Sequence, residues 1–253
     1  MSGLIVVDVG NSRIKWGRCE GGRVTEVAPL PPDSVNAWQQ QLDSWPGAAA
    51  CAWVVSGVHP QRRDALIAWL RSRVAGVQVI DSYQQLPLAV RVDAPEMVGI
   101  DRLLNAVAAN TRRPSRSPAV IVDAGSAVTV DLVYGAGAFR GGAIFPGLRL
   151  MAQALHDHTA LLPLVDFEQV ELAPASSTVA AIRAGIFSAV RGGIWRLVCR
   201  YVECADANDA MPVYVTGGDA AFLVAADPDL GELWPEMTLH GILHSVAGPT
   251  AHG

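Results

Sequence analysis

The chain is poor in lysine and lacks long apolar runs. Lysine and arginine together make up 19 of its 253 residues, and Lys15 is the only lysine. No apolar stretch approaches the ~18–20 residues of a membrane span, and the N-terminus has neither the charged region nor the cleavage site of a signal peptide. We therefore expect a cytoplasmic protein without a membrane partner, and a specific role for the one lysine.

Paired cysteines and common site signatures are also missing. The four cysteines form no C-x-x-C pair and have no histidines at zinc spacing, which indicates free thiols in a reducing compartment. The net charge of −5 argues against non-specific nucleic-acid binding. The chain contains no Walker A, dinucleotide-binding, zinc-protease or nucleophile-elbow pattern.

One short pattern occurs twice. An apolar run ends in Asp8-Val9-Gly10 and again in Asp123-Ala124-Gly125, and small polar residues follow both times. Asp8 and Asp123 lie 123 − 8 = 115 positions apart, close to half the chain. This spacing suggests two related domains, residues 1–115 and 116–253. Two α/β halves that each begin with a strand hairpin are typical of the ribonuclease H-like (actin-like) class, with a nucleotide cleft between the domains. The alternative is a single doubly wound sheet.

Apolar periodicity gives the expected elements. The strands are expected at 4–8, 13–18, 23–27, 50–56, 77–80, 120–123, 128–134, 139–144 and 212–216. The helices are expected near 34–44, 61–74, 101–112, 148–156 and 178–204, while 239–246 fits helix or strand. The charged, proline-containing segment 111–118 is the expected linker.

The first loop has the composition of an anion site. Gly10 permits a tight turn, and the backbone N–H groups of residues 10–13 can then point inward as an anion nest. Asn11 and Ser12 add side-chain donors, and Lys15 adds a compact positive charge. Asp8 would position Mg²⁺ through water. An ordinary β-hairpin is the alternative for one such loop taken alone.

The second loop differs from the first. Ser126 supplies the hydroxyl nearest the turn, and Asp123 supplies a carboxylate at the end of its strand. Asp131 lies toward the far end of the next expected strand, where it is either functional or a solvent-exposed strand end. Two glycine segments, 141–147 and 216–218, suit close backbone approach to a ligand, and Gly217 and Gly218 could let an adenine ring lie against bare backbone.

Gly99-Ile100-Asp101-Arg102 stands between the loops, just before an expected helix. Asp101 is either a plain helix N-cap or a carboxylate that accepts a proton from a substrate hydroxyl. Beside it, Arg102 could hold an anionic substrate by a bidentate contact. A low pKa for such a base is acceptable in phosphoryl transfer, which relies mostly on positioning and charge neutralisation.

Taken in order, these motifs resemble those of type III pantothenate kinases over essentially the whole chain. The resemblance rests on Asp8-Val9-Gly10-Asn11-Ser12-Arg13-Ile14-Lys15, Gly99–Arg102, Asp123–Asp131, Gly141–Gly147 and Thr216–Gly218. It implies a homodimeric kinase of the acetate and sugar kinase/Hsp70/actin superfamily. The implied reaction moves the ATP γ-phosphate to the primary hydroxyl of pantothenate, the first step of coenzyme A synthesis.

The resemblance also implies roles for individual residues. Residues 8–15 and Ser126 would bind ATP, and Asp101 would be the proton acceptor. Gly99, Ile100, Asp101, Arg102 and Thr178 would bind pantothenate. Asp123 would hold the monovalent cation, K⁺ or NH₄⁺, that the family needs besides Mg²⁺.

Three departures from the family pattern are visible. Ser12 and Ser126 stand where threonine is usual, and both keep the hydroxyl. Val92 stands where a tyrosine commonly lines the substrate pocket, so that contact is lost or supplied differently. A kinase for another small alcohol and a nucleotide-binding accessory protein for transcription are the alternative functions.

Overall fold

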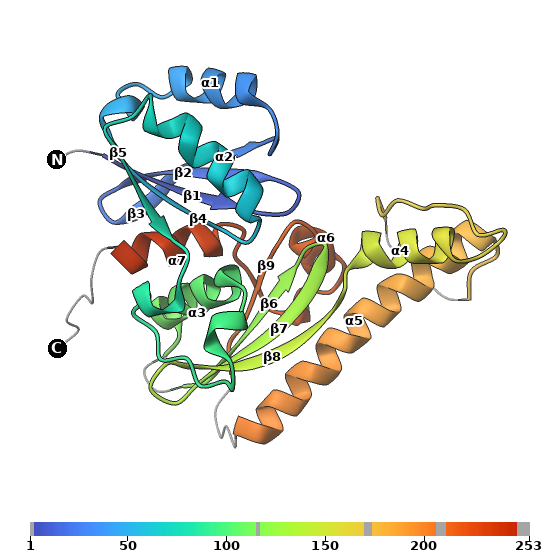
Figure 1. Ribbon diagram of the computed structural model, residues 1–253. Helices are drawn as coiled ribbons and strands as arrows, with labels where there is room; N and C mark the ends of the chain where they lie inside the picture. The colour runs from blue at the N-terminus through green and yellow to red at the C-terminus, as the bar shows by residue number, and fades with distance from the viewer. Residues whose placement is uncertain (1–2, 115–116, 170–173, 206–210, 247–253) are drawn as a thin grey trace. The chain divides into compact units, whose positions relative to one another are not determined.

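The computed structural model describes residues 3–114, 117–169, 174–205 and 211–246 (Figure 1). The chain forms two compact units. The first contains the residues up to Arg112 together with the segment from Glu236 onward, and the second contains Arg113–Pro235. The first division lies close to the expected boundary at 115, but the chain returns to the first unit at its C-terminal end.

The first unit is built on a five-stranded sheet in the order β3-β2-β1-β4-β5. The strands β1, β2 and β3 form an antiparallel meander, and β4 and β5 continue the sheet parallel to β1. Their bounds are β1 Leu4–Val9, β2 Ile14–Glu20, β3 Arg23–Leu30, β4 Ala52–Gly57 and β5 Gly76–Ile80.

Helices α1 (Val35–Ser44) and α2 (Pro60–Arg71) enclose a core rich in tryptophan. The Ser34 hydroxyl caps α1 by accepting a hydrogen bond from the Ala37 N–H. Trp16 of β2 packs edge-on against Trp53 of β4, with ring centroids 4.8 Å apart. This packing of large aromatic side chains holds the loop-bearing β1–β2 hairpin to the rest of the sheet.

Helices α3 (Ile100–Arg112) and α7 (Met237–Val246) pack against each other in the same unit. A Cβ atom on Gly241 would lie 2.0 Å from the Leu104 carbonyl oxygen, so only glycine allows this close crossing. The buried Thr238 hydroxyl also donates to Asn105 Oδ1 at 2.8 Å. These contacts place α7 in the first unit, although the sequence suggested residues 116–253 as one domain.

The second unit repeats the sheet, with the order β10-β9-β6-β7-β8. Again three strands form an antiparallel meander, and β9 and β10 extend the sheet in parallel from β6. Strands β6 to β10 therefore correspond to β1 to β5, which confirms two domains of one α/β topology. The bounds are β6 Ala119–Ala124, β7 Ala127–Tyr134, β8 Ala138–Pro146, β9 Val213–Thr216 and β10 Glu232–Leu233.

Three helices accompany this sheet: α4 (Leu148–Asp157), α5 (Thr178–Ala205) and α6 (Ala220–Ala226). The 28-residue α5 packs on β6 and β7, and α4 packs on α5. Short 3₁₀ turns complete the two units at Ala48–Ala50, Tyr83–Gln85, Pro95–Met97 and Pro228–Leu230. No helix in the described part of the chain has the length and hydropathy of a membrane span.

Candidate active site

The first loop is the tip of the β1–β2 hairpin. The Gly10 N–H donates to the Arg13 carbonyl oxygen at 3.0 Å, which closes the turn and leaves Asn11 and Ser12 exposed at its tip. The structure therefore presents the predicted loop to solvent as a short turn closed by a backbone hydrogen bond.

Asp8 lies in a row of three polar residues across neighbouring strands. It is paired with Lys15 on β2 and with Ser56 on β4, so the three side chains share one face of the sheet. The Ser56 hydroxyl is buried and donates to the Ile80 carbonyl oxygen at 2.7 Å. Asp8 thus has the only lysine of the chain directly across from it.

The Gly99–Arg102 motif opens α3 beside a pocket of about 480 Å³. Gly99, Ile100 and Gly57 all line this pocket. A Cβ atom on Gly57 would lie 2.4 Å from the Val9 carbonyl oxygen, so the pocket wall touches the end of β1. Within the first unit, the motif and the strand that leads into the first loop therefore meet at the same end of the sheet.

Asp101 lies in the first turn of α3 rather than before it. Its Oδ1 accepts a hydrogen bond from the Arg102 N–H at 2.8 Å. A Cβ atom on Gly99 would approach that same oxygen to 2.6 Å, so glycine makes room for the carboxylate. The backbone thus holds the carboxylate at the N-terminal end of α3, where the helix dipole interacts favourably with negative charge.

The second loop repeats the row of the first with different side chains. Asp123 on β6 is paired with Thr129 on β7 and with the buried Thr216 on β9. The Thr129 hydroxyl oxygen is itself buried, and it has no hydrogen-bond partner among the described residues. A hydroxyl therefore occupies the place that corresponds to Lys15.

Ser126 is held by the glycine segment that leads into α4. The Gly147 N–H donates to the Ser126 carbonyl oxygen at 2.9 Å. A Cβ atom on Gly147 would lie 2.1 Å from the Gly125 carbonyl oxygen, which explains why glycine is needed there. The structure thus brings the second loop and the end of the 141–147 segment together.

The 216–218 segment also lies against the second loop. Gly217 has φ +103°, and a Cβ atom on it would lie 2.4 Å from the Ala124 carbonyl oxygen. The Asp219 N–H donates to that same oxygen at 2.9 Å. Arg149 of α4 closes the arrangement with an ion pair of 2.6 Å to the Asp219 carboxylate. No motif in the sequence pointed to this pair.

The structure also describes the surroundings of Asp131 and Val92. Asp131 is 1% exposed, so the alternative of a solvent-exposed strand end is wrong. Its Oδ1 would lie 2.4 Å from a Cβ atom on Gly142, so the bare backbone of β8 accommodates the carboxylate. Val92 is half-buried in the segment that precedes α3.

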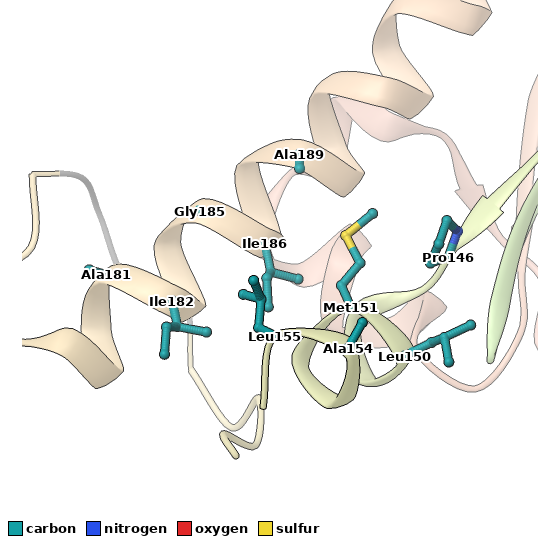
Figure 2. A pocket seen from close by; sticks show the side chains of 10 residues that line it. All are labelled: Pro146, Leu150, Met151, Ala154, Leu155, Ala181, Ile182, Gly185, Ile186 and Ala189. Atoms are coloured by element: carbon teal, nitrogen blue, oxygen red, sulfur yellow. The ribbon is translucent and has the colours of Figure 1, made fainter. Parts of the chain in front are cut away.

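Thr178 is the exposed first residue of α5 in the second unit, whereas Asp101 belongs to the first. Further along α5 an apolar pocket of about 430 Å³ lies between that helix and α4 (Figure 2). Its walls are apolar: Met151 and Leu155 of α4 lie near Ile186 of α5, and Leu150 lies on the side of Pro146. Such walls offer nothing that could neutralise a phosphate.

Comparison with known proteins identifies the family. A family model described as type III pantothenate kinase matches residues 4–200. The chain belongs to the type III pantothenate kinase family. A relative of that name from Rubrobacter xylanophilus is 35% identical over 257 residues, which cover 94% of this chain and 95% of the relative. Another, from Phenylobacterium zucineum, is 31% identical over 251 residues, 95% and 96% of the two chains.

Solved structures show the same fold. A Campylobacter jejuni protein assigned to the Baf family of transcriptional activators superposes with a TM-score of 0.62 at 21% identity, over 96% of this chain and 97% of that one. An inorganic polyphosphate/ATP-glucomannokinase from Arthrobacter sp. strain KM gives 0.51 at 16% identity, over 98% and 99%. The predicted actin-like fold of this type III pantothenate kinase family member is confirmed.

The family match spans most but not all of the predicted site. Asp8, Asp101, Asp123 and Thr178 lie inside the matched range, while Gly217 lies beyond it. Thr129 lies inside the Asp123–Asp131 motif, but the sequence assigned it no individual role, and the strand register is what places it opposite Asp123. The ATP and divalent metal expected for this chain follow from its membership of a kinase family.

Proposed function

We propose that this member of the type III pantothenate kinase family phosphorylates pantothenate with ATP and yields 4′-phosphopantothenate, the first step of coenzyme A biosynthesis. The observation that carries the proposal is the placement of Asp101. Its carboxylate lies at a helix N-terminus, in a motif that lines a pocket at the sheet end where the first loop begins.

The first loop is the proposed phosphate site, formed by residues 8–15. The exposed tip at Asn11 and Ser12 supplies backbone and side-chain donors, and Lys15 supplies positive charge. Asp8 would hold Mg²⁺ through water. The bound Mg²⁺ would neutralise charge on the phosphate oxygens.

Asp101 is the proposed base. The primary hydroxyl of pantothenate forms a bond to the γ-phosphorus of ATP while the bond from that phosphorus to the β-γ bridging oxygen breaks. The hydroxyl proton passes to the Asp101 carboxylate, and ADP leaves. Gly99, Ile100, Arg102 and Thr178 are the proposed pantothenate contacts, with the Arg102 guanidinium suited to the pantothenate carboxylate.

The second loop is the proposed site of the monovalent cation, K⁺ or NH₄⁺. The residues fit such an ion, because the buried Thr129 oxygen has no partner among the described residues and lies opposite the Asp123 carboxylate. Hydroxyl and carboxylate oxygens suit a hard cation. The cation would add positive charge beside ATP, where Ser126, Gly217 and Gly218 are the proposed contacts.

We also propose a homodimer that does not bind nucleic acid. The dimer is supported by the apolar pocket between α4 and α5 and by exposed Leu150, Leu161 and Trp195 in the same unit, which are apolar surfaces of the kind that interfaces bury. The net charge of −5 supports the absence of nucleic acid. Light scattering after gel filtration tests the dimer.

The kinase proposal is tested by ADP release from purified protein with ATP, Mg²⁺ and K⁺, with and without pantothenate. We expect pantothenate-dependent release that Asp101→Asn lowers by about 10²–10⁴-fold, the usual contribution of general base catalysis. Asp43→Asn, on the exposed side of α1, serves as the control. Release independent of pantothenate, or an Asp101→Asn variant as active as the parent, contradicts the proposal. A panel of sugars and other small alcohols tests the substrate.

A further inference from the structure

Arg62 belongs to none of the sequence motifs, yet its side chain joins three segments of the first unit. From the first turn of α2, its Nε and Nη2 donate to the two carboxylate oxygens of Asp33 at 3.0 and 2.8 Å. Its Nη1 donates to the carbonyl oxygen of Asn11 at the tip of the first loop. The β3–α1 connection, α2 and the loop are thus held by one guanidinium.

The arrangement fixes the direction of the third hydrogen bond. A planar guanidinium held at two of its nitrogens by one carboxylate has little freedom left, so the donor aimed at the loop is oriented in advance. The backbone of Arg62 is fixed as well, because its N–H donates to the His59 ring at the N-terminus of α2, at 3.4 Å. Lysine, a single flexible donor group, lacks this geometry.

The contact with Asn11 determines how the loop presents its backbone. The Asn11 carbonyl belongs to the same peptide plane as the Ser12 N–H, and in a trans peptide the two groups point in opposite directions. Holding the carbonyl toward α2 therefore turns the Ser12 N–H to the other side of the loop. If this peptide flipped, a carbonyl oxygen would take the place of the N–H and would repel phosphate.

The charge of Arg62 is already balanced. Its ion pair with Asp33 offsets the positive charge, so the pair adds little net attraction for a polyanion. The positive charge of Arg62 is therefore engaged by Asp33, and its Nη1 donor is directed at the loop backbone.

We propose that Arg62, oriented by Asp33, is a positioning residue for the first loop: it sets the Asn11–Ser12 peptide so that the Ser12 N–H faces the ATP phosphates. The inference deepens the proposed function and rests on it for the identity of the ligand. Arg62 acts through the loop and does not touch substrate.

The test compares four variants with the parent: Arg62→Gln, Arg62→Lys, Asp33→Asn and the double variant Arg62→Gln/Asp33→Asn. The dissociation constant of a non-hydrolysable ATP analogue is measured by calorimetry, and kcat and KM for ATP by ADP release. Because a hydrogen bond to a charged group is involved, we expect about tenfold weaker binding for Arg62→Gln. Arg62→Lys should recover part of it, and kcat should stay within about twofold of the parent value.

The double variant and a matched control separate positioning from direct binding. If Asp33 acts only through Arg62, the double variant binds no more weakly than Arg62→Gln alone. Arg73→Gln is the control, since Arg73 lies just beyond the other end of α2 and donates to the Trp69 carbonyl oxygen at 3.0 Å. Its ATP affinity should equal that of the parent. Melting curves identify any variant that fails to fold. If Arg62→Gln fails to fold, the ATP affinities of Arg62→Lys and Asp33→Asn decide whether Arg62 positions the loop.

Two results would overturn the inference. ATP affinity within twofold of the parent in every variant means that the loop does not need Arg62. Tighter binding in Asp33→Asn together with weaker binding in Arg62→Gln means that Arg62 contacts phosphate directly. A parent that binds the analogue but does not turn over pantothenate contradicts the proposed function instead, and the affinity series still decides the role of Arg62.

Discussion

The two sheets repeat one topology, but the polar rows at their first strands differ in one place. In the first unit Asp8 lies between Lys15 and Ser56, and in the second Asp123 lies between Thr129 and Thr216. The small hydroxyl residue on the parallel strand is retained. The antiparallel strand carries an ammonium group in one unit and an unpartnered hydroxyl in the other, when only described residues are considered.

This difference gives a physical reason for two kinds of cation. A covalently attached ammonium needs no supply from solution, and it pays no loss of translational freedom on each binding event. A carboxylate beside a buried hydroxyl offers oxygen ligands to a mobile ion instead. The comparison therefore agrees with a lysine at one loop and a K⁺ or NH₄⁺ ion at the other, as proposed.

Substituting the corresponding glycine in each unit tests how closely the backbones of the two sheets correspond. Gly57 and Gly217 follow the hydroxyl residue of their rows, and a Cβ atom on either would lie 2.4 Å from a carbonyl oxygen of the neighbouring strand. Only Gly217 has a positive φ, of +103°. We expect both alanine variants to lose about 1–3 kcal/mol through overpacking. Gly217→Ala should lose a further ~1–3 kcal/mol through backbone strain. Urea unfolding measures both, and equal losses would mean that strain is unimportant.

Replacing Lys15, the residue at which the first row differs from the second, should strongly lower kcat/KM for ATP. Lys15→Thr gives the first row the side chain of the second and removes the ammonium. We expect a fall of about 100-fold in kcat/KM for ATP, the size seen when one preorganised electrostatic contact is lost. Steady-state kinetics at several ATP concentrations measures the change. Lys15→Arg keeps the charge and should recover part of the loss, whereas unchanged kinetics in Lys15→Thr would remove Lys15 from the site.

The reverse exchange should change the need for a monovalent cation. Thr129→Lys places an ammonium opposite Asp123, so we expect the activity ratio with and without K⁺ to fall toward one. Thr129→Val keeps the shape and removes the hydroxyl, which should weaken K⁺ binding about tenfold. Because the hydroxyl lacks a partner among the described residues, its loss should hardly alter the melting temperature without K⁺. A K⁺ titration of the melting temperature measures binding independently of turnover, and unaltered K⁺ dependence in both variants would contradict the assignment.

The sequence predicted the features that depend on local patterns. The spacing of Asp8 and Asp123 indicated the duplicated topology, and apolar periodicity placed α3, α4 and α5 to within one residue at each end. Features that need long-range contacts were missed. The bond between Asn105 and Thr238 joins residues 133 positions apart, so periodicity alone could not assign α7 to the first unit.

The same reason explains which residues of the candidate site were missed. The role of Thr129 depends on strand register, and the pairs Arg62–Asp33 and Arg149–Asp219 depend on how segments far apart in the sequence pack together. Thr129 lies within the Asp123–Asp131 motif, but its place opposite Asp123 follows only from the register, and neither ion pair leaves a motif in the sequence. For Asp131 the sequence suggested a wrong environment. Its place near a strand end suggested solvent exposure, but the absence of a side chain on Gly142 leaves room for the carboxylate to be buried.

The cysteines give the smallest expected difference between the units. Cys19 of β2 is buried, whereas Cys204 of α5 is exposed. Burial raises the pKa of the Cys19 thiol to about 12, only partly opposed by a hydrogen bond from the Val6 backbone. The unfolded chain ionises this thiol near pH 9, so the stability that depends on the neutral thiol is present below pH 9 and is lost as the pH rises toward 12.

The unfolding free energy of the parent should therefore fall by about 1 kcal/mol between pH 8 and pH 10 because of the Cys19 thiol. Cys19→Ala removes this ionisation, so its stability should fall less over the same interval, while Cys204→Ala should follow the parent. Urea unfolding at pH 8 and pH 10 gives the change in unfolding free energy with pH for the parent and for each variant. Comparing these changes cancels the stability that each substitution loses at both pH values. If Cys19→Ala and Cys204→Ala show the same pH dependence, the Cys19 thiol is not protected by burial, and the two units do not differ in this respect.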